Sequence, residues 1–269
     1  MFPTYKYNPL ISVITVVYND ESHIEDTIKS IINQTYKNIE YIIIDGKSTD
    51  NTNAIINKYI NFIKRYISEK DQGIYDAMNK GIKIANGEWI IFMNSGDKFY
   101  SETILSELHK FLFSGYQLIY GKVEICYASG LHYIKNTKSL EKLKYGMPFC
   151  HQSLLIDAPL MKKHRYKLDD THSSIFNFIV DCYLERCKFY DSGLIVSSYR
   201  AHGVSDTNRV MILKSWQKIA QKLNHSTGRI NKWHINIYYW YVILLAKLKH
   251  KIKLFLPKQL TMLIIKFIK

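Results

Sequence analysis

Short runs of β-branched and apolar residues recur along the first hundred residues, and their alternation with stretches of helical spacing constrains the fold more than any other feature. Buried strands are predicted over residues 11–17, 40–44 and 89–93. Apolar residues recur at helical spacing over 24–32 and 55–66. This order predicts an α/β fold with a mostly parallel central sheet, helices on both faces and right-handed crossovers.

The segment 68–97 is the part of this pattern that points to a ligand. A Gly-broken turn leads into a predicted helix over 74–85, after a short strand, and the helix stops at Asn86-Gly87. The strand 89–93 then runs directly into the acidic loop 94–97. Open α/β sheets hold ligands at the carboxyl ends of their strands. A carboxylate on such a loop can hold a divalent metal, and the metal can hold a diphosphate.

The second half of the chain predicts a different arrangement. Residues 118–127 and 131–135 are rich in Tyr, Ile and Val around a Gly-containing turn, which predicts an antiparallel hairpin. A loop over 145–152 leads into a strand, 153–156. A helix over 174–187 follows, and a last strand over 188–198 closes this half.

The basic charge of the chain is concentrated in its tail. Residues 207–269 carry thirteen Lys and Arg and no Asp or Glu, so they supply +13 of the net charge of +14 and leave the first 206 residues at +1. The uncharged core within 233–253 is shorter than the roughly 20 apolar residues that span a bilayer. Aromatics at one end and alternating lysines at the other predict amphipathic helices on an anionic membrane surface. A helical subdomain packed on the core, or a homodimer contact, is the alternative.

The cysteines and the N-terminus indicate the compartment. Cys126, Cys150, Cys182 and Cys187 show no paired spacing, so the sequence indicates neither a zinc site nor a disulfide framework. We expect four reduced core cysteines. The first ten residues lack the basic start and apolar core of a signal peptide, which predicts a cytoplasmic protein.

Four segments together resemble the inverting glycosyltransferases of family 2, which have the nucleotide-sugar-binding GT-A fold. They are ISVITVVYN at 11–19, IEYIIIDGKSTDNT at 39–52, SEKDQGIYDAMNKGIKIANGEWIIFMNSGD at 68–97 and FCHQSLLI at 149–156. The subgroup that the chain resembles most assembles bacterial O-antigen or capsule repeat units, and the resemblance thins beyond Ile156. It implies a GT-A domain over 1–206, with a nucleotide-sugar half over about 1–100 and an acceptor half over about 101–206, followed by the basic helical extension 207–269.

The resemblance also implies a donor site. Asp45 matches the carboxylate that binds the nucleotide base, and Asp71 matches a position near the base and ribose. The alternatives are that Asp45 satisfies backbone donors and that Asp71 belongs to a charged surface turn. The residues implied to bind the donor nucleotide are Val17, Tyr18, Asn19, Asp45, Asp71, Tyr75, Asn79, Asn94, Ser95 and Gly96.

The loop 94–97 matches the acidic metal motif of the family but departs from it. The family usually has two or three aspartates there, whereas Asp97 is the only charged residue of this loop and Asn94 offers a neutral amide oxygen. Mn²⁺ and Mg²⁺ accept one or two carboxylates when phosphate oxygens and waters fill the other positions. Asp97 is therefore expected to bind Mn²⁺ or Mg²⁺, with an Asx-type turn as the alternative.

The acceptor side rests on five further residues. The resemblance implies that His151 and Gln152 contact sugar hydroxyls, and that Arg200 and His202 contact phosphate or metal, with a surface loop as the alternative for the last two. Asp181 matches loosely the acid that removes the acceptor's proton. A salt bridge from Asp181 to Arg186 or Lys188 is the other interpretation.

The sequence thus predicts a metal-dependent hexosyltransferase. We expect it to use UDP-glucose or UDP-galactose and to form a β-linkage to a glycan on undecaprenyl diphosphate, at the inner face of the bacterial plasma membrane. Two alternatives remain. A basic, Tyr-rich protein could bind nucleic acid, although the long aliphatic runs in the tail argue against it. The chain could also be a degenerate glycosyltransferase-like scaffold, as the Asn94 and Gly96 substitutions suggest.

Overall fold

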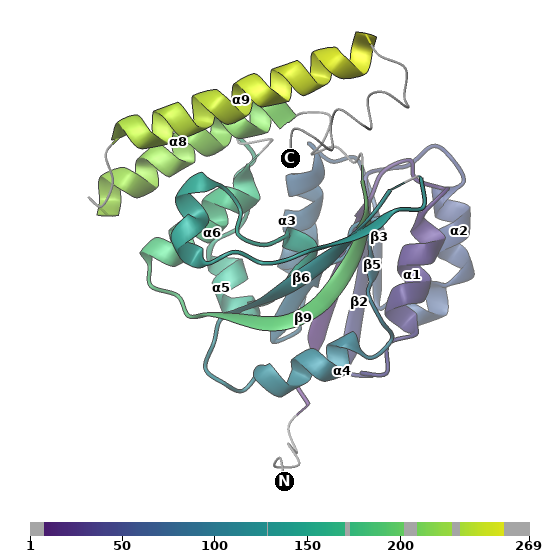
Figure 1. Ribbon diagram of the computed structural model, residues 1–269. Coiled ribbons are helices and arrows are strands. Elements are labelled where there is room, and N and C mark those ends of the chain that lie inside the picture. The colour runs from purple at the N-terminus through teal and green to yellow at the C-terminus, as the bar shows by residue number, and fades with distance from the viewer. Residues whose placement is uncertain (1–7, 128, 170–172, 202–208, 228–231, 256–269) are drawn as a thin grey trace.

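A single nine-stranded sheet runs through the protein, with helices packed on both of its faces (Figure 1). The computed structural model describes residues 8–127, 129–169, 173–201, 209–227 and 232–255. The strand order is β3-β2-β1-β4-β8-β6-β9-β5, and β7 pairs with β6 outside this path. The α/β class predicted from the alternating pattern is confirmed.

The first half of the chain builds the parallel part of the sheet. Its elements are β1 (Ile11–Val17), α1 (Ile24–Ile32), β2 (Ile39–Asp45), α2 (Thr52–Lys58), β3 (Arg65–Ser68), α3 (Ile74–Ile84) and β4 (Trp89–Phe92). β1 pairs in parallel with β2 on one side and with β4 on the other, and β2 pairs in parallel with β3. All seven residues of β1 are buried, as a central strand covered on both faces requires.

The helix predicted over residues 55–66 is wrong beyond Lys58. There α2 ends, a 3-10 turn spans Ile60–Phe62, and Tyr66 lies in the edge strand β3 opposite Ile43. The apolar spacing of this segment fits a helix, but its last residues pair with β2 instead, which leaves Tyr66 half-buried. The backbone N–H of Lys64 donates to the carbonyl of Tyr41 (2.8 Å), which ties the segment to the sheet.

The second half adds mostly antiparallel pairs. Its elements are β5 (Lys98–Phe99), α4 (Ile104–Leu108), β6 (Leu118–Cys126), β7 (His132–Lys135), β8 (Leu154–Asp157), α5 (Ala158–Lys163), α6 (Ser174–Leu184) and β9 (Phe189–Arg200). The predicted hairpin is confirmed as β6 and β7. β8 runs antiparallel to both β4 and β6, whereas β9 runs parallel to β6 and antiparallel to β5.

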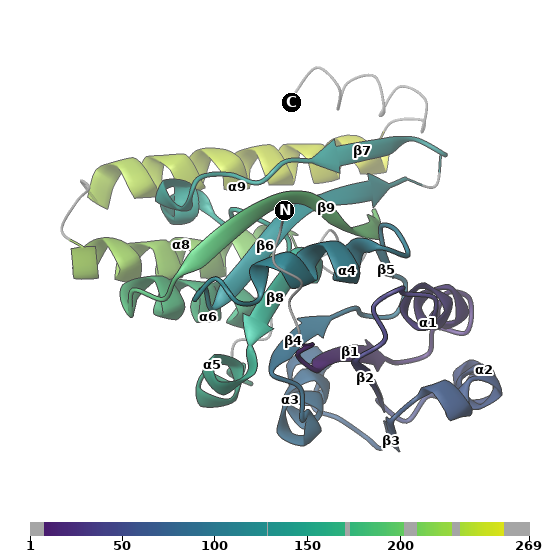
Figure 2. The ribbon, with the colours of Figure 1, turned by 90° about the horizontal axis from the view of Figure 1, so that it is seen from below.

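Alternate strand residues point into two separate cores. One core contains Ile14, Ile42 and Ile90 with residues of α3, α5 and α6. The other contains Val13, Ile43 and residues of α1, α2 and α4. The helices therefore form two layers around the sheet (Figures 1 and 2).

The basic tail begins as two helices that lie side by side across one end of the molecule, α8 (Arg209–Thr227) and α9 (Lys232–Phe255) (Figure 1). Ile219 and Leu223 of α8 are buried in the same core as α3 and α6. Trp216 lies so close to Gly146 that a Cβ there would meet its ring at 2.6 Å. α8 is therefore packed on the core, in line with the alternative of a helical subdomain, while α9 packs on α8 through Ile235 and Tyr239.

Candidate active site

Strand direction brings the polar loops of the two halves to the same edge of the sheet. β1, β2 and β4 are parallel, so their carboxyl ends meet there. β8 is antiparallel to β4, so its amino end, with His151 and Gln152 just before it, lies at this same edge. The site predicted at the carboxyl ends of the strands is thus walled by residues from both halves.

The loop 94–97 is held firmly against α1. Gly96, at φ 89°, donates from its backbone N–H to the hydroxyl of Thr27 (3.0 Å), and that hydroxyl donates to the carbonyl of Asp97 (2.8 Å). The hydroxyl of Ser95 donates to the carboxylate of Asp20 (2.6 Å). A residue with a Cβ would be strained at the positive φ of Gly96, so its glycine fits this turn.

Asp97 is a buried acid with an unusual affinity for its proton. Its side chain is 8% exposed. Burial raises the pKa of Asp97 to about 7, a hydrogen bond from Gln152 lowers it, and the nearby charge of Asp20 raises it further. The carboxyl is thus bonded to Gln152, and not to the backbone as the alternative of an Asx-type turn would require. A buried acid beside a second carboxylate is an environment that a cation would stabilise.

Asn94 adds a second oxygen to this environment. Its Oδ1 is buried and has no hydrogen-bond partner within the described part of the chain. The backbone N–H of Asp97 donates to the carbonyl of Asn94 (2.9 Å), which keeps the two residues in one tight turn. A buried oxygen without a donor is costly unless something binds it. Together with Asp97, it fits the oxygen-rich ligand set that Mn²⁺ and Mg²⁺ prefer.

Asp45 lies at the end of β2 and is completely buried. Its carboxylate accepts hydrogen bonds from the backbone N–H of Ser48 (3.1 Å) and from the hydroxyls of Ser48 and Ser68. Beside it, Asn19 at the end of β1 accepts from the backbone N–H of Thr49 (2.8 Å). Asp45 thus organises the loop that follows β2, and base binding by Asp45 stays a prediction.

Three residues crowd together next to this loop. A Cβ on Gly46 would lie 2.5 Å from Oδ2 of Asp71 and 3.3 Å from the ring of Tyr18. Tyr18 is 63% exposed, so its ring face is open to solvent. An exposed aromatic ring beside a carboxylate suits stacking and hydrogen bonding of a planar base. The buried Val17, the last residue of β1, accepts from the backbone N–H of Gly46 (2.9 Å) and fixes this approach.

Three other predicted residues face inward. The amide of Asn79 donates to the carbonyl of Tyr166 (2.8 Å) and accepts from its N–H (3.0 Å). Tyr75 packs on the ring of Tyr166, with centroids 5.5 Å apart. His151 stacks on Phe92, and its Nε2 is bonded to the Tyr166 hydroxyl (2.7 Å), while burial lowers the pKa of His151 to about 3. These side chains are occupied in the core, and their contacts with the donor or a sugar stay predictions.

Asp181 lies on α6 and is bonded to lysines that the sequence did not suggest. Its Oδ1 is 2.8 Å from Nζ of Lys222 on α8, and its Oδ2 is 4.0 Å from Nζ of Lys167. The alternative of a salt bridge is therefore correct in kind, but its partners are not Arg186 or Lys188. Within the described part of the chain, no hydrogen bond or ion pair joins Asp181 to the loop 94–97.

The comparisons with known proteins fit this arrangement. The family described as "Glycosyl transferase family 2" matches residues 12–181, well over half of the chain. The chain belongs to glycosyltransferase family 2. The match begins in β1 and ends at Asp181, so it covers the strand-end loops and all but the last three residues of α6, but neither α8 nor α9.

Several glycosyltransferases resemble the chain in sequence. An "Uncharacterized glycosyltransferase" of Haemophilus influenzae is 31% identical over 66% of this chain and 73% of its own length. A "PGL/p-HBAD biosynthesis glycosyltransferase" of Mycobacterium tuberculosis is 31% identical over 54% of this chain and 58% of its own. The "Putative teichuronic acid biosynthesis glycosyltransferase TuaG" of Bacillus subtilis is 35% identical over 42% of this chain and 49% of its own. The chain thus spans about half the length of these last two relatives.

Solved structures confirm the GT-A fold of this family 2 member. The crystal structure of S. aureus TarS 1-349 in complex with UDP has a TM-score of 0.63 at 17% identity, over 86% of this chain and 69% of TarS 1-349. The mannosyltransferase PcManGT of Pyrobaculum calidifontis, in complex with GDP-Man and Mn²⁺, has a TM-score of 0.66 at 12% identity, over 97% of this chain and 80% of its own. At these identities the likeness shows the fold alone.

Two residues of this glycosyltransferase were missed by the analysis of its sequence. Asp20 bonds Ser95 and His23 and acts on the pKa of Asp97. It lies three residues after the end of β1, so the strand-end rule that predicted the loop 94–97 could have found it. Thr27 was hidden because its partner, the loop 94–97, lies about seventy positions away in the chain.

The remaining predicted phosphate contacts are at the end of β9. Arg200 is half exposed and its guanidinium lies 3.5 Å from the carboxylate of Asp26 on α1. Asp26 also lies 3.8 Å from Nζ of Lys98, the residue after Asp97. Arg200 is therefore near the loop 94–97 but is paired with an acid. His202 lies outside the described residues.

Proposed function

We propose that this family 2 enzyme transfers a hexose from a UDP-sugar to a lipid-linked glycan at the edge of the sheet where Asp97 lies. One observation carries the proposal: a buried carboxyl with a pKa of about 7 and an unpartnered amide oxygen occupy one tight turn at the end of β4. A buried carboxyl and an unpartnered oxygen are both costly without a binding partner, and a bound cation would supply one. The donor diphosphate is expected on the open side of this turn.

The residues that would hold Mn²⁺ or Mg²⁺ are Asp97 and Asn94, with Asp20 adding negative charge nearby. The chemistry that such a cation supplies when bound is neutralisation of the charge on the departing diphosphate. The chain's own part is to hold this turn rigid, through Thr27 and Ser95, and to keep Asp97 away from water. Pre-organised charge of this kind avoids the cost of reorganisation during the reaction.

Several observations support a UDP-sugar as the donor. Tyr18 and Asp71 lie close to Gly46 beside the end of β2, and the side chain of Tyr18 is exposed. An exposed aromatic ring next to a carboxylate suits the binding of a pyrimidine base. TarS, which has the same fold, has been crystallised with UDP and with UDP-GlcNAc. We retain UDP-glucose or UDP-galactose as the donor and a β-linkage as the outcome of a single displacement from the face opposite the leaving group.

The acceptor side of the proposal rests on the cavity beside Asp181. The cavity measures about 410 Å³ and is lined by the basic side chains of Lys162, Lys163, His164, Arg165 and Lys167. Such a lining suits an acceptor that carries phosphate groups, as a glycan on undecaprenyl diphosphate does. We propose Asp181 as the base that takes the acceptor's proton, with its carboxylate held in place by the ion pair with Lys222.

A membrane location is supported by the outer face of α9. Apolar and aromatic residues at helical spacing are exposed along it: Trp233, Ile237, Trp240, Tyr241, Leu244 and Leu248. The opposite face, with Ile235 and Tyr239, packs on α8. Within the described residues, no helix combines the length and apolar character needed to cross a bilayer. We propose that α9 lies flat on an anionic membrane surface, with its aromatic rings at the headgroup level.

Ligand-induced stabilisation tests the donor site. Because ligands that bind the native state raise its melting temperature, we expect UDP, UDP-glucose and UDP-galactose to raise it by several degrees in the presence of Mn²⁺, and GDP-mannose to have little effect. Asp97→Asn should abolish the part of the shift that needs Mn²⁺. An equal shift in Asp97→Asn, or stabilisation by GDP-mannose alone, would refute the proposed donor site.

Vesicle sedimentation tests the membrane proposal. The double variant Ile237→Ser, Trp240→Ser should bind vesicles containing anionic phospholipid about tenfold more weakly, since it removes two exposed side chains that would insert into the membrane surface. Phe62→Ser is the matched control, because Phe62 is equally exposed, at 61%, but lies after α2 on the other layer of helices. Binding of the native chain should weaken with added salt. Equal binding by the double variant and the native chain would exclude α9 as the membrane surface, and tighter binding to a DNA duplex than to vesicles would favour the nucleic-acid alternative.

A further inference from the structure

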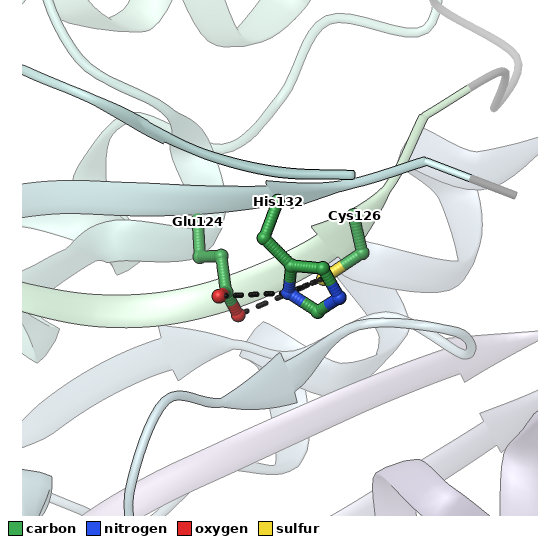
Figure 3. A group of neighbouring side chains, drawn as sticks. All are labelled: Glu124, Cys126 and His132. Atoms are coloured by element: carbon green, nitrogen blue, oxygen red, sulfur yellow. Dashed lines mark hydrogen bonds and ion pairs between the residues drawn. The ribbon is translucent and has the colours of Figure 1, made fainter. Parts of the chain in front are cut away.

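Three metal-ligating side chains of different kinds meet on the β6–β7 hairpin, outside the candidate donor site. Glu124 and Cys126 lie two positions apart on β6, so their side chains point to the same face of the strand. His132 of β7 is the direct cross-strand partner of Cys126. Figure 3 shows the imidazole lying against both the carboxylate and the sulfur.

The distances between atoms of these three side chains are close to those of a tetrahedral zinc site. Sγ of Cys126 lies 3.6 Å from Nδ1 of His132 and 3.6 Å from Oε2 of Glu124, and Nδ1 lies 3.0 Å from Oε1 of Glu124. Zinc bonds of about 2.3 Å to sulfur and about 2.1 Å to nitrogen or oxygen give tetrahedral edges of about 3.6 Å to the sulfur and about 3.4 Å between nitrogen and oxygen. The distance from Sγ of Cys126 to Nδ1 of His132 matches such an edge. Nδ1 of His132 and Oε1 of Glu124, now at hydrogen-bonding distance, would have to separate by about 0.4 Å to bind the metal together.

A fourth residue holds the carboxylate in place. The hydroxyl of Ser198 on β9 donates to Oε2 of Glu124 (2.8 Å) and lies 3.0 Å from Sγ of Cys126. Ser198 is 6% exposed and is the register partner of Glu124. Hydrogen bonds of this kind orient the ligands of protein metal sites and leave one carboxylate oxygen directed at the metal.

We infer that Glu124, Cys126 and His132 form a site for Zn²⁺ or a similar transition metal. Thiolate and imidazole ligands favour such metals over Mg²⁺ and Mn²⁺, whose preferred ligands are oxygens. This site is therefore chemically distinct from the oxygen site proposed at Asn94 and Asp97. Paired cysteine spacing is absent here because the ligands are cross-strand neighbours, so a search for such pairs along the sequence does not find them.

A bound metal would stabilise the strands next to the loop 94–97. Ser198 of β9 pairs with Glu124 on one side and with Lys98 of β5 on the other. Lys98 is the residue that follows Asp97. A cation on the hairpin would thus fix β6, β7 and β9 next to the wall of the donor site, with one coordination position left for water or another ligand.

Cobalt substitution tests the site without relying on activity. The full chain, freed of metal, should take up one Co²⁺ with the absorption of a thiolate-to-cobalt charge transfer and of tetrahedral cobalt, and Zn²⁺ should displace it. Cys126→Ser and His132→Gln should remove the charge-transfer band or weaken binding at least 100-fold. Cys187→Ser, at another half-buried cysteine, and Asp97→Asn should leave it unchanged.

A second measurement needs only the native chain. Zn²⁺ should slow alkylation of Cys126 by iodoacetamide at least tenfold, as followed by peptide mass spectrometry, and leave Cys187 unaffected. A hydrogen-bonded cluster without metal affinity would show no charge-transfer band and no protection of Cys126, and either result would overturn the inference. Persistence of the band in a folded Cys126→Ser variant would do the same. Because these readouts do not involve UDP-sugars, their failure is separate from failure of the proposed function.

Discussion

Two acids, Asp97 and Asp181, lie in opposite surroundings although both were predicted to act in the same reaction. Asp97 is buried, has no basic partner among the contacts of the described residues, and has its pKa raised to about 7 by burial. Asp181 has a 24% exposed side chain and is bonded to Lys222 and Lys167. The first environment disfavours the charged form of the acid, whereas the second one pairs the acid with basic side chains.

The difference separates a proposed metal ligand from a proposed base. A carboxylate that costs free energy when charged gains most from a cation, which supports the proposal that Asp97 binds one. A carboxylate that already has lysine partners gains less from a further cation, which leaves Asp181 as the proposed proton acceptor. The two halves of the proposed mechanism can therefore be tested by variants that keep the shape of each side chain and remove its charge.

Asp97→Asn should have the largest effect. We expect transfer of labelled hexose from UDP-glucose or UDP-galactose into the lipid extract of bacterial membranes to fall about 1,000-fold, or roughly 4 kcal/mol, because the main charged ligand is lost. The fold should persist, since an amide can still bond Gln152. Asp26→Asn, an exposed acid on the neighbouring α1, should change the rate less than about threefold. A rate within tenfold of the native chain would remove Asp97 from the mechanism.

Asp181→Asn should have the next largest effect, because it removes the proposed base. Loss of a general base lowers kcat by about 100-fold or more, and Lys222→Gln should lower it only a few-fold. Neither variant should alter stabilisation by UDP with Mn²⁺, because no hydrogen bond or ion pair among the described residues links Asp181 to the loop 94–97. Equal, small losses in both variants, with equal decreases in melting temperature, would instead make Asp181 a structural partner of α8.

The contrast between these acids also shows what the sequence could and could not predict. The position of Asp97 follows from local rules, because a buried strand ends just before it and parallel strands bring their carboxyl ends together. The parallel strands β1, β2 and β4 were predicted for the same reason. The lysine that pairs with Asp181 is 41 positions away, on a helix that the charge pattern assigned to the membrane. No local pattern carries that contact.

Long-range packing explains the other differences. Tyr66 has apolar spacing that fits a helix, and only the exposed edge of β2 decides that it joins the sheet. Asn79 was predicted to face the donor, but its amide bonds the backbone of Tyr166, 87 positions later. Cys126 and His132 are close in sequence, yet their approach depends on the register of the hairpin. Contacts that depend on strand register or on a distant segment cannot be predicted from a short stretch of the sequence.

The smallest predicted effect is a dependence of Mn²⁺ affinity on pH, which follows from the burial of Asp97. The pKa of Asp97 is raised from 3.8 to about 7, so a proton competes with a cation for the carboxyl near neutrality. The ionised fraction falls about eightfold between pH 7.5 and pH 6, and the affinity for Mn²⁺, measured by calorimetry in the presence of UDP, should fall by about the same factor.

The metal-free chain should show the matching change in stability. Because the folded state holds this proton more tightly than the unfolded state, the contribution of Asp97 to stability is fully present below pH 3.8 and is lost as the pH rises through 7. Asp97→Asn should therefore lose less melting temperature than the native chain between pH 5 and pH 8. If the variant and the native chain showed the same dependence of melting temperature on pH, the burial of Asp97 would not be the source of this change.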